Sequence, residues 1–546
     1  MPTVIVDGHE ITLAEHERLN GIQAAERVGI DIPRYCWHPG LSVVASCRMC
    51  LVETGTRDPA TGKISMLGKL VPACQTPAKD GTVFVTDSDK VRQSRAMVEE
   101  DLLMDHPIDC PICDKAGECL LQDYHFAHGQ KERRADIRPF TSRRREMGET
   151  VSLFVDRCVM CSRCVRFCRE VSGSSELMVI NRGSHEEIDV VPGYPLANKL
   201  SGNVVDLCPV GALGDRDFLY RQRVWFMKRH EAVCTGCSTG CSIFTEENQD
   251  TVHRLKPRDN PHINQWWMCD EGRYGWHHVH SEHRLVQLRR RDKSGHANIE
   301  WHQLPAEVTS RLSAAGRLAA VISPHLTVEE AYLLATFIRG LDPHAVLALG
   351  PVPVVGQDER FKTGFTIRAE KCPNRRGVEA VIQHFAGGVM TFSEFLSQLD
   401  AGSLGGVWVS GGYKDAWIDE ATAARFDGLK ELVVQDLFDS PLYQRASFQL
   451  PGAAFPERDG SYVNFADRLQ LARWAIRPPQ GVWVEGALYW RLLNRPGMFS
   501  ARKALSEVAA AIPYFSVAGG EVSDLGIDLK INQIAGSDSS PTMTTA

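Results

Sequence analysis

The sequence predicts an α+β fold in the first half of the chain and an α/β fold in the second half. Two observations carry this prediction. Of the 17 cysteines, 16 lie at or before Cys269, among short β-prone segments and turns. Beyond about Pro305, short apolar runs bounded by Gly, Ser or Asp alternate with helix-like stretches, which is typical of a mostly parallel sheet.

The first predicted elements form a small β-rich module. Residues 4–6 and 11–13 flank the turn-forming residues 7–9 and predict a hairpin, residues 21–28 predict a short helix, and residues 83–85 predict a closing strand. A helix follows over residues 89–104, with Ser88 or Asp87 as its cap. Residues 131–145 are basic and poor in apolar residues, so we expect a linker or surface arm; contact with a partner subunit is the alternative.

The later elements follow the α/β pattern. Apolar runs at residues 318–322, 407–409 and 432–434 predict strands, and residues 328–341 predict a helix between two of them. Residues 536–546 are rich in Ser and Thr and are expected to fray.

Composition narrows the class of protein. At about 100–200 residues per domain, 546 residues hold roughly three to five domains. The chain is 43% hydrophobic and 24% charged, which excludes a disordered or collagen-like chain, and its net charge of −7 gives no basic field for nucleic acid. No apolar run approaches about 18 residues and no secretory signal is recognisable, so we expect no membrane span and a reducing compartment. Cysteines there favour metal or cluster binding over disulfides.

The first cysteine group lies in the β-rich module. Four thiolates suffice for a [2Fe–2S] cluster, and the hairpin-rich context suits a ferredoxin-type β-grasp domain. Zinc is the alternative, although only one Cys-x2-Cys pair is present. The predicted ligands are Cys36, Cys47, Cys50 and Cys74.

The second group combines one histidine with three cysteines. His106, Cys110, Cys113 and Cys119 are spaced to hold a four-iron cube, in which a neutral imidazole replaces one thiolate and alters the potential. Taken alone, His106 could be an ordinary helix-end histidine.

The third group has three close cysteines and one remote cysteine before proline, which is typical of a [4Fe–4S] site. Its predicted ligands are Cys158, Cys161, Cys164 and Cys208. Cys168 is followed by Arg169 where a second cluster would require proline, so we expect Cys168 to bind no iron.

The fourth group is Cys234, Cys237, Cys241 and Cys269, again with zinc as the alternative. Gly236 and Gly240 are expected to let the backbone pass close to a cluster. The four groups use fifteen cysteines and leave Cys168 and Cys372 over; Cys372 is expected to be a plain loop cysteine.

Four segments resemble a known family. The sequence Cys47-Arg-Met-Cys50-Leu-Val-Glu53 and residues 106–123, 158–164 and 200–213 resemble the large iron–sulfur subunit (the 75-kDa subunit) of bacterial-type NADH–quinone oxidoreductase, respiratory complex I. The resemblance covers residues 1–225 and implies one [2Fe–2S] cluster on the first group and one [4Fe–4S] cluster on each of the second and third. Residues 258–261 and 268–273, with the fourth group, resemble the opening domain of molybdopterin oxidoreductases and imply a third [4Fe–4S] cluster.

Several cofactors are not expected on this chain. Molybdopterin enzymes usually carry Lys where Glu271 stands, a negative group where an anionic pterin would approach, and the region after Pro305 is short for such an enzyme. There is no Gly-x-Gly-x-x-Gly and no Walker loop. We therefore expect no flavin, no dinucleotide site and no molybdopterin.

The resemblance implies a domain order and a function. The expected parts are a [2Fe–2S] domain (1–82), a [4Fe–4S] domain with one histidine and three cysteine ligands (83–122), a ferredoxin-like [4Fe–4S] domain (123–225), a molybdopterin-oxidoreductase-type [4Fe–4S] domain (226–284), a degenerate α/β domain (285–535) and a tail (536–546). The implied function is electron transfer from an NADH/FMN subunit toward quinone, as a peripheral subunit on the cytoplasmic side of the inner membrane, with no catalytic residue of its own. The alternatives are a diaphorase-side subunit of a soluble NAD-linked hydrogenase or formate dehydrogenase, and a zinc-rich scaffold.

Overall fold

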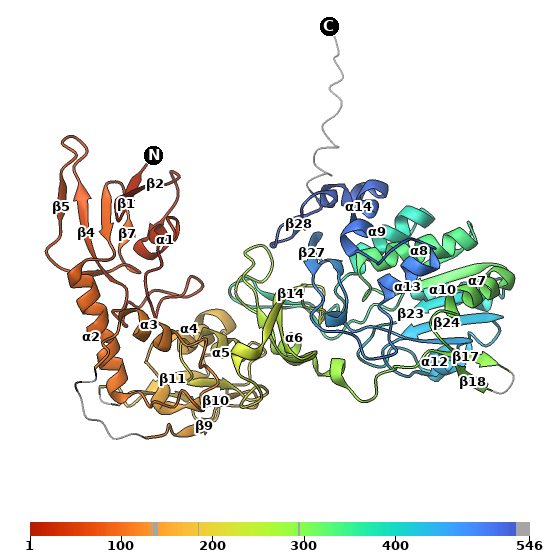
Figure 1. Ribbon diagram of the computed structural model, residues 1–546, viewed down its shortest axis with the longest axis horizontal. Coiled ribbons are helices and arrows are strands. Elements are labelled where there is room, and N and C mark those ends of the chain that lie inside the picture. The colour runs from red at the N-terminus through yellow and green to blue at the C-terminus, as the bar shows by residue number, and fades with distance from the viewer. Residues whose placement is uncertain (133, 135–139, 184, 293–294, 531–546) are drawn as a thin grey trace, which may run out of the picture. The chain divides into compact units, whose positions relative to one another are not determined.

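The computed structural model describes residues 1–132, 134, 140–183, 185–292 and 295–530. The chain divides into two compact units (Figure 1): the first is Met1–Met227 with Phe361–Thr363, and the second is Lys228–Arg360 with the chain from Gly364 onward. The finer six-part division stays a prediction, and the expected tail at residues 536–546 lies outside the described residues. None of the described helices is both long and apolar enough to cross a membrane.

The first unit opens with the predicted hairpin and helix. A sheet in the order β2-β1-β8-β4-β5, with β6 on β4, packs over a core that includes Val4, Ile22 and Phe84. Strands β1 and β8 run parallel, so the closing strand lies beside the first one. The elements are β1 (Thr3–Val6), β2 (His9–Thr12), β3 (Leu19–Asn20), α1 (Gly21–Glu26), β4 (Leu51–Arg57), β5 (Ile64–Met66), β6 (Val71–Pro72), β7 (Pro77–Ala78) and β8 (Thr82–Val85).

The rest of the first unit consists of short elements around the cysteine loops. Helix α2 (Asp89–Asp105) is capped by the Ser88 hydroxyl, as predicted. The others are α3 (Leu120–His128), β9 (Arg144–Glu146), β10 (Val151–Phe154), η1 (Val155–Arg157), α4 (Arg163–Phe167), the π-helical turn η2 (Cys168–Ser172), β11 (Leu177–Ile180), β12 (Glu187–Val190), α5 (Asn203–Leu207), β13 (Leu213–Asp215) and η3 (Val224–Phe226). They include one sheet in the order β13-β10-β9.

The expectation of a linker over residues 131–145 is wrong at its end, where strand β9 begins. The Arg143 guanidinium bonds to Asp156 and Glu187, and the Arg145 guanidinium bonds to Glu187 and Asp189. These arginines have partners within the chain, which a reading of local charge density could not reveal.

The second unit begins with an antiparallel sheet of three strands, β14 (Lys228–Val233), β15 (Ser242–Asn248) and β16 (Thr251–Pro257). Helix α6 (Asp270–Tyr274) and the turn η4 (His277–His280) follow. This small sheet positions the fourth cysteine group.

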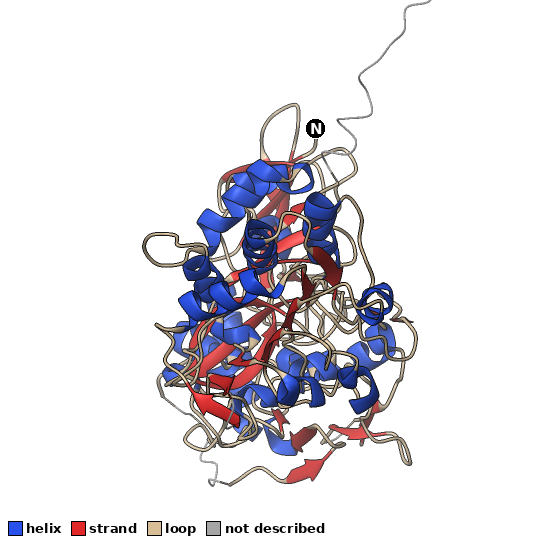
Figure 2. Ribbon diagram, turned by 90° about the vertical axis from the view of Figure 1, so that its right-hand side faces the viewer, coloured by secondary structure: helices blue, strands red, loops and turns tan. Residues whose placement is uncertain are grey.

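A seven-stranded sheet dominates the second unit, in the order β18-β17-β25-β24-β23-β19-β20. Helices lie on both sides of its strands (Figure 2), and alternate side chains enter two cores: Ile322 and Trp408 face one, Val321 and Val409 the other. Five strands are parallel, as predicted, namely β19 (Leu318–Ile322), β20 (Val346–Leu349), β23 (Gly406–Ser410), β24 (Glu431–Asp436) and β25 (Phe448–Pro451). The strands β17 (Arg289–Asp292) and β18 (Gly295–Asn298) add an antiparallel edge that the sequence did not predict.

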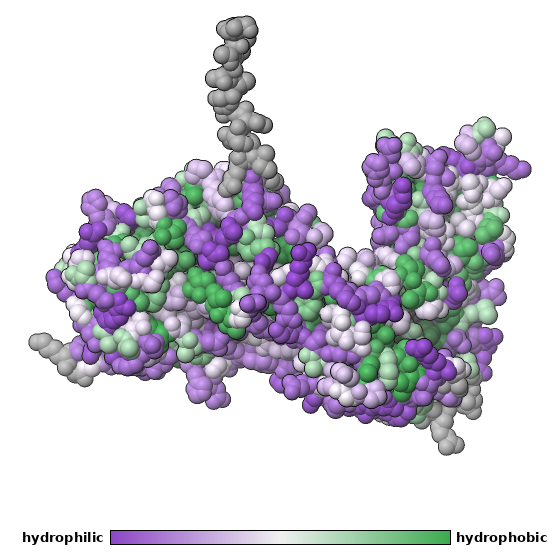
Figure 3. Space-filling model, turned by 180° about the vertical axis from the view of Figure 1, so that it is seen from behind, coloured by the Kyte–Doolittle hydropathy of each residue, from purple (hydrophilic) through white to green (hydrophobic). Residues whose placement is uncertain are grey.

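The helices that flank this sheet include α8, which matches its predicted bounds. They are α7 (Leu304–Ala315), α8 (Val328–Leu341), α9 (Arg375–Ala386), α10 (Phe392–Asp400), α11 (Glu420–Ala424), α12 (Pro441–Arg445), α13 (Glu485–Leu492) and α14 (Ala501–Ala511). The remaining elements are β21 (Glu359–Arg360), β22 (Thr366–Ile367), η5 (Phe455–Glu457), β26 (Gly460–Val463), β27 (Arg468–Ala472), η6 (Pro513–Gly519) and β28 (Ile527–Asp528). On the face in Figure 3, hydrophilic residues separate scattered apolar patches.

Candidate metal centres

The first cysteine group comes together in the β-grasp module. Cys47 and Cys50 precede β4, and Cys74 follows β6, whose pairing with β4 brings the two loops together. Hydrogen bonds with the thiols of Cys47 and Cys74 lower the pKa of the Cys36 thiol, and contact with Cys74 lowers that of Cys50. Ala45 and Arg48 have left-handed backbones, with φ of 52° and 60°, which turn the loop tightly around the site. The structure therefore brings together all four residues predicted from the sequence.

The second group lies between α2 and α3. His106 ends α2, and Cys119 immediately precedes α3. Burial, reinforced by the nearby Arg157 guanidinium, lowers the pKa of His106 to about 4, so the imidazole is neutral and able to bind metal. Its buried Nδ1 atom has no hydrogen-bond partner among the described residues. The reading of His106 as an ordinary helix-end histidine leaves that orphaned nitrogen unexplained.

The cysteines of this second group are also close together. The charge of Cys110 raises the pKa of Cys113, after the larger effect of burial, and burial raises the pKa of Cys119 to about 11. A Cβ atom on Gly211 would lie 2.1 Å from the Cys113 sulfur, so only glycine fits there. The buried Arg157–Asp109 ion pair, at 2.9 Å, holds the same loop.

The third group surrounds one cavity, which is lined by the four predicted cysteines and by apolar residues of the loop after α5. Burial raises the pKa of Cys161 to about 11, and the neighbouring thiols Cys158 and Cys208 contribute to the raised pKa of Cys164. Four buried sulfurs around a cavity fit a cluster, whose iron would compensate the cost of burying thiolates.

Cys168 is absent from the residues that line this cavity. Burial raises its pKa to about 12, and its thiol contacts the Ser174 side chain and the Leu177 backbone. Cys168 does lie close enough to Cys164 to add slightly to that residue's raised pKa. Its environment is thus consistent with its exclusion from the ligands, which stays a prediction.

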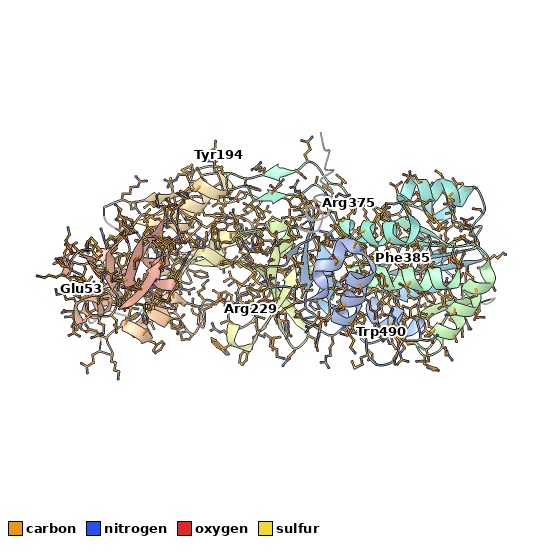
Figure 4. The ribbon with its side chains drawn as sticks, turned by 90° about the horizontal axis from the view of Figure 1, so that it is seen from above. Glu53, Tyr194, Arg229, Arg375, Phe385 and Trp490 are labelled. Atoms are coloured by element: carbon orange, nitrogen blue, oxygen red, sulfur yellow. The ribbon has the colours of Figure 1, made fainter. Side chains whose placement is uncertain are left out.

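The fourth group is built on the sheet β14-β15-β16 of the second unit. Cys234 follows β14, on which Figure 4 labels Arg229, and its amide donates to the Cys241 carbonyl at 2.9 Å. Cys269 caps α6 and its sulfur accepts from the Gly272 amide at 3.4 Å. All four predicted cysteines line one cavity, with Phe365 to Ile367 beside them.

Close approach of the backbone to the cluster is predicted at Gly236 and Gly240. The structure shows the closest approach to a sulfur at Gly272 instead. A Cβ on Gly272 would lie 2.9 Å from the Cys234 sulfur, whereas one on Gly236 would make an ordinary 3.6 Å contact. At Gly240 the backbone has a φ of +59°, a left-handed conformation that glycine adopts without steric cost. Gly272 lies more than thirty residues beyond the first cysteines of the group, so cysteine spacing alone could not identify it.

The charge argument at Glu271 needs correction. Its carboxylate pairs with the Lys371 ammonium at 2.6 Å, a residue 100 positions further along the chain. The negative charge expected there is therefore compensated. Beside this pair lies a cavity of about 400 Å³, lined by Cys234, His278, His325 and Tyr413 among others.

The remaining cysteine, Cys372, is fully buried and lies 3.8 Å from the Glu370 carboxylate. Among the described residues, no three His, Cys, Asp or Glu side chains converge as they would around a single ion. In the third and fourth groups the sulfurs surround cavities instead, which favours clusters over zinc there.

Comparison with known families matches the four groups one by one. Residues 2–89 match a 2Fe-2S iron-sulfur cluster binding domain, and residues 95–134 match the NADH-ubiquinone oxidoreductase-G iron-sulfur binding region. Residues 148–214 match the ferredoxin-like domain of NADH-quinone oxidoreductase subunit 3, and residues 227–281 match the molybdopterin oxidoreductase Fe4S4 domain.

Curated relatives carry related names. The G subunit of NADH-quinone oxidoreductase from Streptomyces coelicolor is 34% identical over 62% of this chain and 39% of its own length. The G subunit from Pseudomonas fluorescens is 36% identical over 53% and 31%, and the Solanum tuberosum mitochondrial NADH dehydrogenase (ubiquinone) iron-sulfur protein 1 is 38% identical over 50% and 35%.

A solved structure of an NAD⁺-reducing [NiFe]-hydrogenase, in its H₂-reduced state, matches at 26% identity over 41% of this chain and 91% of that chain, with a TM-score of 0.33. The matched segments span less than half of the length of the curated relatives named above. Residues 2–281 are therefore similar to iron–sulfur binding domains, two of which are named for NADH-quinone or NADH-ubiquinone oxidoreductase subunits.

Proposed function

We propose that this chain is an electron-transfer subunit of NADH:quinone oxidoreductase, complex I, which relays electrons from an NADH/FMN-binding subunit toward quinone. The observation that carries the proposal is that four separate groups of neighbouring cysteines each lie inside a matched iron–sulfur domain. When bound, the clusters supply one-electron carriers. The proposed content is one [2Fe–2S] cluster on the first group and one [4Fe–4S] cluster on each of the other three.

The residues of the chain hold these carriers and set their environment. Seven of the eight cysteines in the third and fourth sites are buried, and burial is one of the factors that fix a cluster's potential. His106 is a neutral ligand where the other sites have a thiolate, so the second site carries one negative charge less. No acid, base or nucleophile is required, because only electrons move.

We further propose that flavin and molybdopterin are absent from this chain. The proposed partners are the NADH/FMN subunit and other peripheral-arm subunits, through which the chain attaches to the cytoplasmic side of the inner membrane. The support is the similarity to the relatives named above and the lack of a dinucleotide-binding motif in the sequence.

Purification of the native complex tests this function. We expect the full chain to co-purify with a flavoprotein and with membrane subunits, and the chain alone to reduce no ferricyanide with NADH. Co-purification with a nickel–iron or molybdenum subunit would support the hydrogenase or formate dehydrogenase alternative. About one molybdenum per chain, or zinc in place of iron, would contradict the proposed cofactors.

A further inference from the structure

One arginine of α4 contacts ligand residues of two different sites. The Arg166 Nη2 atom donates to the Cys36 carbonyl, and the same atom donates to the Cys161 carbonyl at 3.2 Å. Its Nη1 atom donates to the Ser42 carbonyl. Arg166 is 2% exposed, so its charge lies almost entirely out of water, between the ligand loop of the first site and that of the third.

Arg163 and Glu170, which lie near Arg166 in the sequence, also form hydrogen bonds to the first-site loop. We call this contact between the ligand loops of the first and third sites the junction. Arg163 donates to the Trp37 carbonyl at 2.6 Å and to the Leu207 carbonyl at 3.2 Å. These two carbonyls belong to the residue after Cys36 and the residue before Cys208. The Glu170 carboxylate accepts from the Ser42 amide and hydroxyl at 2.9 and 2.7 Å, which holds the first-site loop between Cys36 and Cys47.

Burying a cation costs free energy unless hydrogen bonds and a nearby negative charge compensate it. Carbonyl oxygens partly compensate the charge of Arg166, and no carboxylate forms an ion pair with it among the described residues. Its guanidinium bonds directly to the backbone of Cys36 and Cys161, so it lies beside two of the predicted ligand groups, where a bound cluster would add negative charge. The same field favours any electron added to a centre bound there.

We propose that Arg166, supported by Arg163, is a shared charge-compensating residue for the first and third clusters. Because its guanidinium touches a ligand residue of each, its charge stabilises the reduced form of both. An electron that leaves one centre for the other stays beside the same cation. The contribution of Arg166 to the driving force between them therefore largely cancels, while both potentials rise. This inference rests on the proposed function.

The test uses the full chain with its clusters, in EPR-monitored redox titrations. Arg166→Gln removes the charge and keeps a hydrogen-bond donor; we expect the reduction equilibrium of both clusters to fall by about tenfold, equivalent to about 59 mV for one electron. The difference between the two potentials should stay within about twofold in equilibrium constant. Arg166→Lys, which keeps the charge, should restore both potentials. Arg92→Gln is the control, because its side chain is 52% exposed and, among the described residues, pairs only with Asp87 and Asp89 of its own segment, and it should shift neither.

Unchanged potentials in Arg166→Gln, or a shift in only one cluster, would overturn the inference. Loss of iron from that variant would also overturn it, because Arg166 would then serve only to hold the loops. If the unmodified chain binds no cluster at all, the proposed function fails instead. The two failures are therefore distinguishable in one series of samples.

Discussion

The ligand loops of the first unit and the seven-stranded sheet of the second unit differ in what they bury. In the first, charged groups such as Arg157, Arg163 and Arg166 are buried beside the cysteine loops. In the second, the seven-stranded sheet buries apolar side chains on both faces, and neither of its two cores includes a cysteine. From this difference we expect cluster binding to be coupled to folding in the first unit, whereas the two cores of the large sheet form without any cysteine.

The largest expected difference between the two units is in their protection from hydrogen exchange after iron is removed. In chain stripped of iron by a chelator under reducing conditions, we expect the amides around the first three sites to lose protection from hydrogen exchange. Strands β19 and β23 should keep theirs, since their contacts involve no cysteine. Equal loss in both regions would contradict the comparison.

A large-to-small substitution in the core of the sheet should destabilise the second unit and leave the iron sites of the first unit intact. Trp408 is fully buried and contacts Phe337 and Tyr489, with ring centroids 6.0 and 5.8 Å away. Trp408→Ala should cost about 3–5 kcal/mol of stability in the sheet, measured by denaturant unfolding. Iron content should stay at the wild-type value; a loss of iron from the first unit would show that the two are coupled.

A smaller effect is expected from a methyl group added beside the second site. Gly211→Ala places a Cβ against the Cys113 sulfur, and overpacking of this kind costs about 1–3 kcal/mol. The EPR signal of the second cluster should change or vanish. Gly428→Ala, where a Cβ would meet nothing within 4 Å, is the matched control in the second unit. Identical spectra for both variants would disprove the close approach.

The stability of the first unit should also depend on pH. Burial raises the pKa of Glu99 from 4.5 to about 7, while Tyr35 donates a hydrogen bond to it. The unfolded chain ionises first, so stability is full below pH 4.5, falls between pH 4.5 and 7, and is then constant. The loss is about 3 kcal/mol. Glu99→Gln should remove this difference between unfolding at pH 5 and pH 8; an unchanged pH dependence would assign it to other groups.

Local patterns predicted the local structure. The hairpin at β1 and β2, the capped helix α2 and the bounds of α8 follow from alternation, caps and helical spacing. The cysteine spacing also grouped side chains that the structure brings together, including Cys208, which is 44 residues beyond Cys164.

Long-range contacts account for what the sequence did not predict. The Lys371–Glu271 pair, the approach of Gly211 to Cys113 and the junction at Arg166 each join segments about 100 or more residues apart. Nothing in either local segment signals such a contact, because its partner is chosen by the packing of the whole unit.

The central claim is that four ligand groups hold four clusters, and iron analysis with low-temperature EPR tests it most directly. The intact chain should contain about 14 iron atoms, from one [2Fe–2S] and three [4Fe–4S] clusters. Cys208→Ala should lose about four of them and the signal of the third cluster, while Cys168→Ala and Cys372→Ala keep all. Loss of four irons from Cys168→Ala, with full iron in Cys208→Ala, would contradict the assignment.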